Sequence, residues 1–352
     1  MKAWPDQPLA RLPRWLAFAI LAAFLALGAW NSVMLDVRDS AQETDVSQRL
    51  DREERVDMDL YREINRRMAT GESYYEAAGA THRAFGFPTA PFVTVRTPVL
   101  AWGTALIGEQ GWRIIAVLLW AANIIAWMTV PGASLVRRER LLAGVLAAFF
   151  GAIAFMPDIP FSHEALAGLM LSLALALRER SWIAALVLAG IAVALRELAA
   201  PFLLAWLVIA LWHRSWREAA GIALVMGVLA LGLTMHAAAV AEIRLASDDI
   251  SPGWSGLIGL SLPLYGIHVT TLLQTLPLWI AGVLGGLPLL GWAARGGFQG
   301  AFALLWFGGF ILAAALFARQ ENFYWMGLFV PAFGVGLAFL PRAIDGLVSS
   351  PA

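Results

Sequence analysis

Two aspartates, Asp57 and Asp59, stand two residues apart in VDMDLY, and Tyr61 follows them. Carboxylates this close together can share a divalent cation, or one can act as a general base while the other shifts its pKa. The same spacing is also typical of a solvated acidic surface, since the preceding segment DREER is already crowded with charge. Both interpretations stay open at this point.

A histidine adjoins a carboxylate in the segment MPDIPFSHEAL, which carries Asp158, His163 and Glu164. Histidine next to glutamate suits proton transfer or metal binding near neutral pH. The structural alternative is a helix cap, because a carboxylate in the first turn of a helix is stabilised by the helix dipole. The residue types alone do not separate the two.

Isolated arginines interrupt the apolar stretches. Arg196 and Glu197 lie within ALRELAAP, and Arg319 begins the polar part of ARQENFYW. Such charges can keep a hairpin tip among lipid headgroups, but an arginine at a membrane boundary is also a functional candidate. With Arg244, these arginines could bind a phosphate or diphosphate whose lipid tail lies between helices. The remaining polar candidates are Arg96, Glu321, Asn322 and Tyr324.

The composition indicates that a membrane protein positions these residues. Of the 352 residues, 60% are hydrophobic and 14% are charged, whereas globular proteins contain about 25% charged residues. A bilayer core of about 30 Å needs about 20 apolar residues per helix. The sequence therefore predicts an all-α integral membrane fold that forms a single domain, 1–352. About ten transmembrane helices are expected near 15–35, 112–130, 141–156, 165–177, 182–195, 199–212, 219–241, 276–294, 301–318 and 324–341.

The arginines of the short loops predict an orientation with both termini in the cytoplasm, because inner loops are rich in Lys and Arg. Only five of the 25 acidic residues then lie inside, and all five tyrosines lie outside. This scheme requires that residues 254–274, which are apolar enough to cross, form a re-entrant or interfacial helix instead. The inner arginines are Arg137, Arg138, Arg140, Arg178, Arg180, Arg214, Arg217, Arg295 and Arg342.

Residues 36–111 form a large first extracytoplasmic loop in this scheme. Leu60, Ile64 and Met68 recur at helical spacing, which predicts an amphipathic helix on the membrane surface. Aromatic residues suited to the membrane interface follow it, at Tyr74, Tyr75, Phe85 and Phe87.

Several function classes are excluded or weakened. There is no cysteine and the net charge is zero, which removes thiol chemistry and gives no reason to expect nucleic-acid binding. Phosphate-loop, dinucleotide-binding, zinc-protease and serine-hydrolase motifs are absent. Transporters place polar groups near the bilayer midplane, whereas the predicted spans here are nearly free of charge.

The chain resembles the GT-C superfamily of membrane glycosyltransferases, and more closely a group of uncharacterised bacterial membrane proteins related to it. The resemblance lies in DMDLY, GESYYEAAGATHRAFGFPTAPFVTVRTPVLAW, FSHEALAGLMLSLAL, RELAAPFLLAW and ENFYWMGLFVPAFGVGLAFLPRA. It implies a bacterial cytoplasmic-membrane enzyme that takes a sugar from a polyprenyl-phosphate donor on the extracytoplasmic face. The expected partners are that lipid-linked sugar and membrane lipids, and no sequence feature indicates an oligomeric state.

The resemblance also implies residue roles. Asp57 or Asp59 would act as the base in an inverting transfer, without a cofactor, although a divalent cation at this pair stays open. Arg196 with Arg319 or Arg244 would bind the phosphate. The substrate-binding set comprises Arg96, Asp158, His163, Glu164, Arg196, Glu197, Arg244, Arg319, Glu321, Asn322 and Tyr324.

One departure from the superfamily pattern matters. The usual acid follows the first span closely, so Asp36 and Asp39 are rivals for the base. Two other functions compete with sugar transfer. One is a polysaccharide polymerase or ligase using lipid-diphosphate substrates, and the other is a transporter or flippase of such lipids.

Overall fold

The computed structural model describes residues 8–51, 57–130 and 135–348, with side chains of 42–51 left aside. Within these ranges the fold is helical, and the one β-type contact is an isolated bridge between Ala90 and Ile250. The α-helices are α1 Arg14–Asp51, α2 Asp57–Ala69, α3 Tyr74–Phe85, α4 Val99–Met128, α5 Arg137–Phe150, α6 His163–Leu177, α7 Trp182–Leu195, α8 Ala200–Trp212, α9 Trp216–Ile243, α10 Ser261–Val269, α11 Leu278–Gly286, α12 Pro288–Arg295, α13 Gly297–Phe317, α14 Val330–Phe333 and α15 Leu340–Val348.

Short 3-10 segments connect many of these helices. They are η1 Leu9–Arg11, η2 Phe92–Thr94, η3 Gly151–Phe155, η4 Ile159–Phe161, η5 Glu197–Ala199, η6 Leu272–Thr275, η7 Gln320–Leu328 and η8 Gly334–Phe339.

Six segments of the described chain are long and apolar enough to cross a bilayer: Arg14–Ala41, Phe92–Met128, Trp216–Ile243, Leu278–Arg295, Gly297–Phe317 and Val330–Val348. Leu224 and Leu231 of α9, and Phe18 and Leu25 of α1, are exposed, as lipid-facing side chains are. The chain is therefore an all-α membrane protein, as the sequence predicted. Three further apolar helices are shorter, His163–Leu177, Trp182–Leu195 and Glu197–Trp212, and the number of ten crossings stays a prediction.

Helix α6 forms the centre of the bundle, because its residues from His163 to Ala176 are all buried. It packs against α4, α7 and η7. Gly168 permits the closest approach: a Cβ there would lie 2.0 Å from the carbonyl oxygen of Gly327. The position of η7 against α6 therefore depends on a glycine in the middle of the central helix.

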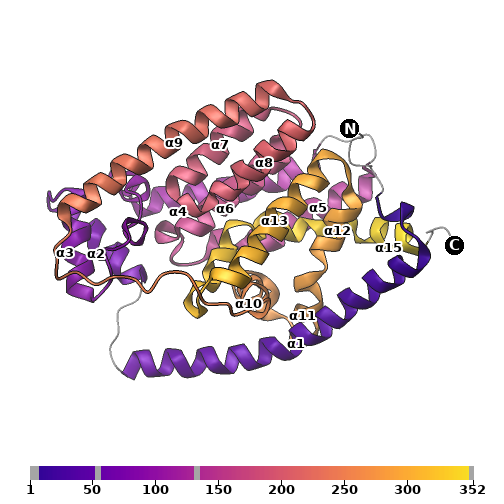
Figure 1. Ribbon diagram of the computed structural model, residues 1–352, viewed down its shortest axis with the longest axis horizontal. Coiled ribbons are helices and arrows are strands. Elements are labelled where there is room, and N and C mark those ends of the chain that lie inside the picture. Colours follow the sequence, from indigo (N-terminus) through magenta and orange to yellow (C-terminus); the bar gives the residue numbers. More distant parts are fainter. Residues whose placement is uncertain (1–7, 52–56, 131–134, 349–352) are drawn as a thin grey trace.

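The two ends of the bundle differ in character (Figure 1). Helices α2 and α3 gather at one end, and α15 lies at the other. At the α15 end, arginines form ion pairs between helices, with Arg178 2.8 Å from Glu218 and Arg342 2.6 Å from Glu139. Arg178 and Arg342, two of the arginines that the sequence scheme places inside, thus lie at the end of the molecule away from α2 and α3.

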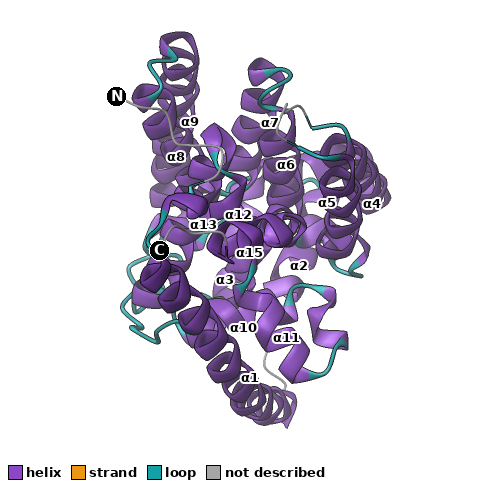
Figure 2. Ribbon diagram, turned by 90° about the vertical axis from the view of Figure 1, so that its right-hand side faces the viewer, coloured by secondary structure: helices purple, strands orange, loops and turns teal. Residues whose placement is uncertain are grey.

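Helix boundaries differ from those expected at several points. Helix α1 continues past residue 35 to Asp51, and α4 begins at Val99 rather than near 112. Gly108, with φ of 68°, kinks α4, which explains why the hydrophobic pattern appeared to begin after it. Helix α1 leaves the main bundle and packs on α10 and α11 (Figure 2).

The segment 254–274 does not form a long helix. It contains α10, of nine residues, which is about 14 Å long and too short to cross a core of about 30 Å alone. All residues from Ser261 to His268 are buried, so α10 is enclosed by protein.

Candidate functional site

A buried arginine lies between two glutamates at the α2–α3 end. The Arg196 side chain is 2% exposed and donates from Nε to Glu164 Oε1 over 2.6 Å. Its Nη1 donates to Glu197 Oε1. Glu164 stands in the first turn of α6, while Arg196 ends α7 and Glu197 begins η5. Three helix ends are thus joined by charge-assisted hydrogen bonds, which are among the strongest in proteins.

A second arginine, Arg96, approaches the same centre just before α4. Its Nε donates to the Tyr61 hydroxyl over 3.0 Å, and its Nη2 contacts the Tyr324 hydroxyl at 3.4 Å. The Tyr74 hydroxyl donates to its backbone carbonyl over 2.6 Å. Burial raises the pKa of Tyr61 and Tyr74 above the ordinary value, so both hydroxyls stay protonated. The guanidinium of Arg96 is therefore bonded by neutral groups.

Arg96 and Arg196 form one electrostatic group with the two glutamates. The hydroxyl of Thr97 donates to the Ala194 carbonyl over 2.7 Å, which ties the start of α4 to the end of α7. The carboxylates of Glu164 and Glu197 act on Arg96 as well as on Arg196. We call Arg96, Glu164, Arg196 and Glu197 the four-charge cluster; its net charge is zero.

The two aspartates of α2 face in different directions. Asp59 Oδ1 lies 3.3 Å from Arg62, which also binds Asp158. Asp57 acts instead on the buried tyrosines: burial raises the pKa of Tyr61, Arg96 lowers it, and the Asp57 carboxylate raises it again. Positions 57 and 61 are one helical turn apart and share a face, which turns Asp57 toward the four-charge cluster.

Asp158 and His163 flank the same region. Arg62 joins Asp158 to α2 and lies over the Phe161 ring, 5.1 Å from its centre. The His163 ring meets Tyr61 edge-on, with 5.0 Å between centres. Its Nδ1 is 3.1 Å from the Phe161 carbonyl. The predicted HEAL motif is thus both a helix start and a wall of the site.

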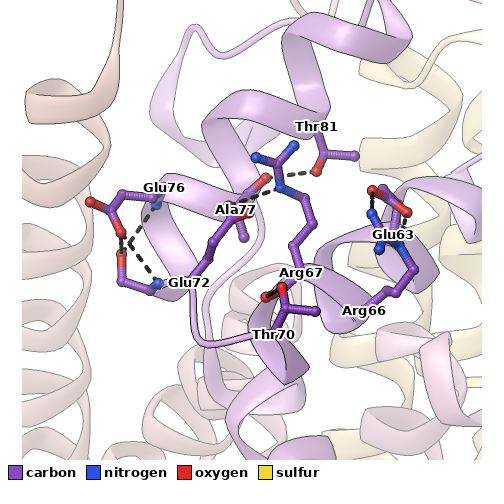
Figure 3. A network of polar contacts seen from close by, with 9 residues as sticks. Glu63, Arg66, Arg67, Thr70, Glu72, Glu76, Ala77 and Thr81 are labelled. Atoms are coloured by element: carbon purple, nitrogen blue, oxygen red, sulfur yellow. Dashed lines mark hydrogen bonds and ion pairs between the residues drawn. The ribbon is translucent and has the colours of Figure 1, made fainter.

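The opposite face of α2 is a solvated surface (Figure 3). Glu63 binds Arg66 over 2.6 Å, and Arg67 binds Glu72 over 2.9 Å. Ser73 and Glu76 form a capping box that begins α3. Leu60 and Ile64 are buried beneath these charges, so the predicted amphipathic helix is confirmed; its contact with lipid stays a prediction.

The predicted site residues Arg319, Glu321 and Asn322 contact one another within their own segment. Asn322 accepts a hydrogen bond from the Arg319 backbone over 3.0 Å, as a cap of η7. The side chain of Arg319 lies 3.7 Å from Glu321, and Arg244 is exposed at the end of α9. No contact among the described residues brings these four side chains into the four-charge cluster.

The rival acids lie elsewhere, between α1 and α10. Asp39 Oδ2 is 3.7 Å from His268 Nε2, whereas Asp36 is exposed. Next to them Arg38 donates to Ser261 over 2.6 Å and to Gln320 over 2.8 Å. Asp39 thus belongs to a second polar group that ties α1 to α10 and η7.

Segment η7 connects these regions because a 3-10 helix places every third residue on one side. Gln320 and Phe323 face α1 and α10, through Arg38 and Tyr265. Tyr324 reaches Arg96, and Gly327 lies against Glu164. The third side carries Trp325.

Trp325 lines an apolar groove of about 260 Å³ next to the four-charge cluster. Leu198 and Pro201, just after Glu197, form one wall, and Phe310 and Phe317 of α13 form another. The ring of Trp254 meets Trp325 edge-on at 5.6 Å. A groove with such walls suits a hydrocarbon chain, and Leu198 connects its wall to Glu197 of the four-charge cluster.

Metal binding finds little support in this arrangement. No group of three or more histidine and acidic side chains with metal-ligand geometry occurs in the described part of the chain.

Sequence reasoning did not place Arg62 or Tyr74 in the site. Arg62 follows Tyr61 directly, so its position next to Asp59 was visible, but its partner Asp158 is 96 residues away.

Comparison with known proteins finds no matching family model, curated protein or solved structure.

Proposed function

We propose that this protein is a membrane glycosyltransferase that moves a sugar from a polyprenyl-phosphate donor to an acceptor hydroxyl. The proposal includes a bacterial cytoplasmic membrane, ten crossings, cytoplasmic termini, and a site on the extracytoplasmic face. The observation that carries it is the four-charge cluster at the end of an apolar bundle, together with a groove sized for a hydrocarbon chain whose wall includes Leu198, the residue after Glu197. A lipid-linked phosphate has this same pairing of charge and apolar chain.

Asp57 is the proposed base. Its carboxylate takes the proton of the acceptor hydroxyl while the acceptor oxygen bonds to the anomeric carbon from the side opposite the phosphate. The bond between that carbon and the phosphate oxygen breaks, and the electron pair leaves with the phosphate. The configuration at the anomeric carbon is inverted. Asp59 is a weaker candidate because it lies on the Arg62 side of α2, away from Tyr61.

Arg96 is the proposed phosphate ligand, in place of Arg196. Arg196 is saturated by two glutamates, and a further anion there would meet both carboxylates. Arg96 is bonded by tyrosine hydroxyls and a carbonyl, which exchange for phosphate oxygens at lower cost. The phosphate charge that develops during transfer is then stabilised by a guanidinium already held in position.

The groove then holds the first isoprene units of the donor. Arg196, Glu164 and Glu197 fix the helix ends around it. A transporter is disfavoured, because the middle of α6 and of α13 carries no charged side chain.

Purified protein in lipid nanodiscs tests the proposal with a panel of polyprenyl-phosphate sugars and bacterial membrane lipids as acceptors. We expect transfer from at least one donor, and a decrease of about 10²–10⁴-fold in Asp57→Asn, as for loss of a general base. Glu63→Gln, the same change on the solvated face of α2, keeps full activity.

Two outcomes contradict the assignment. Full activity in Asp57→Asn shows that Asp57 is not the base. If Asp59→Asn is inactive in the same assay, the role of base passes to Asp59. Transfer only from lipid-diphosphate donors would replace this function by that of a polymerase or ligase. Arg96→Gln is expected to weaken donor binding, seen as a raised KM for the lipid.

A further inference from the structure

A small cavity lies between α2, the start of α4 and the start of α6. Tyr61, Tyr74 and Phe161 form its aromatic walls, and Asn65, Arg96 and His163 supply its polar atoms. Its volume of about 20 Å³ admits one group the size of a water molecule. The cavity is therefore too small for a sugar ring but large enough for one substituent of that ring.

Asn65 brings hydrogen-bonding capacity that the protein does not use. Asn65 lines the cavity, and its side-chain amide makes no hydrogen bond to any part of the chain that the structure describes. Its neighbours on α2 behave differently, since Glu63 and Arg66 bind one another on the solvated face. An amide carries two donors and an acceptor, so Asn65 can both give and receive a hydrogen bond in the cavity.

His163 adds an acceptor whose orientation is set by the backbone. Its Nδ1 lies 3.1 Å from the Phe161 carbonyl, which can only accept, so Nδ1 carries the proton. Burial next to Arg96 and Arg196 disfavours a charged imidazole. Nε2 of the neutral ring is then an acceptor, and the edge contact with Tyr61 holds the ring in place.

We infer that this cavity receives a single hydroxyl of the transferred sugar, which donates to His163 Nε2 and accepts from the Asn65 amide. This inference rests on the proposed glycosyltransferase function and makes the cavity its sugar-selecting subsite. Tyr61 connects the subsite to catalysis, since its ring borders the cavity and its hydroxyl binds Arg96. A sugar hydroxyl seated here keeps the anomeric carbon near Arg96, where the phosphate leaves.

The selection follows from the size and chemistry of the cavity. A sugar without that hydroxyl leaves the imidazole and the amide without partners in a cavity with aromatic walls. Losing two such hydrogen bonds corresponds to about 100-fold in kcat/KM. A bulkier substituent at the same ring position does not fit between Tyr61, Tyr74 and Phe161.

The test uses the sugar that the unmodified protein transfers best, prepared as polyprenyl-phosphate donors lacking one hydroxyl at a time. We expect one deoxy donor to be about 100-fold poorer than the parent, and the others to be less affected. His163→Asn keeps a donor near the Nδ1 position and removes the Nε2 acceptor, whereas His163→Gln keeps a polar group near Nε2. Asn65→Leu keeps the volume of the amide.

The expected result is selective. His163→Asn and Asn65→Leu lower kcat/KM for the parent sugar but leave the discriminated deoxy sugar unchanged, so that the preference disappears. His163→Gln retains part of the preference, and Glu63→Gln retains all of it. A purely structural role for either residue would lower transfer of every donor by the same factor, and that result overturns the subsite.

The failure of the subsite and the failure of the function can be told apart. An unmodified protein that transfers sugars without distinguishing any deoxy donor refutes the subsite and leaves the transferase standing. An unmodified protein that transfers no sugar from any donor refutes the function, and the subsite with it.

Discussion

Replacing Arg196 by methionine tests whether the four-charge cluster is a balanced unit. Methionine keeps most of the length and apolar volume of the side chain but removes the charge. Glu164 and Glu197 then remain with Arg96 alone, and Glu164 loses its 2.6 Å bond. Since the Arg196 and Glu164 side chains are 2% and 8% exposed, water cannot replace the lost partner. Breaking a buried ion pair in this way costs about 3–5 kcal/mol.

The double variant Arg196→Met/Glu164→Gln restores neutrality, because one arginine then faces one glutamate. We expect it to recover part of the lost stability, with a coupling energy of about 1–3 kcal/mol between the two positions. The free energy of unfolding can be followed in mixed micelles by titration with SDS, using the fluorescence of the 16 tryptophans. Glu63→Gln, on the solvated face, serves as the control and leaves the transition in place.

The reasoning is refuted if Arg196→Met unfolds at the same SDS fraction as the unmodified protein. It is also refuted if the double variant is less stable than the single one, because the residual negative charge would then not be the cause of the loss.

Two further predictions concern stability. Burial lowers the pKa of His82 from 6.5 to about 4. The neutral imidazole therefore contributes fully to the free energy of unfolding above pH 6.5, and about 3 kcal/mol of stability is lost as the pH falls toward 4. His82→Asn should flatten this part of the pH profile in SDS unfolding, and an unchanged profile would contradict the prediction. Gly168→Ala places a Cβ 2.0 Å from the Gly327 carbonyl oxygen and should destabilise the protein by about 1–3 kcal/mol. The control Gly232→Ala on α9 has open space around it and should stabilise the protein by about 0.5–1 kcal/mol. Equal effects of the two substitutions would refute the close contact between α6 and η7.

The convergence of polar residues at one end was predictable from the sequence. In the predicted scheme, apolar helices that alternate in direction bring every second connection to the same end, so Arg96, Glu164 and Arg196 were expected at one end. The spacing of Leu60 and Ile64 likewise predicted α2. The sequence pattern could not predict which side chains each arginine binds. Arg96 binds tyrosine hydroxyls and Arg196 binds glutamates, and this difference depends on tertiary packing.

The spacing of the residues in α2 partly predicts which of its two aspartates faces the site. Asp57 and Tyr61 are four residues apart, and Asp59 and Arg62 are three apart, so each pair shares a face of the helix. Since Tyr61 is directed toward Arg96, the helical period turns Asp57 inward and Asp59 toward Arg62. The partner that completes this arrangement, Asp158, belongs to a distant segment and could not be assigned from α2 alone.

The last polar segment was the least predictable part, because it is a 3-10 helix in a stretch that hydropathy assigns to a membrane span. Runs of this helix longer than three or four residues are uncommon, yet η7 has nine residues. The three-residue period directs three side chains of η7 to three different partners. Gln320 contacts Arg38, Tyr324 contacts Arg96, and Trp325 borders the groove. An α-helix would turn each successive residue by 100° and would move these three side chains off their partners. The irregular segment is therefore what joins the charge cluster, the groove and α1 into one site.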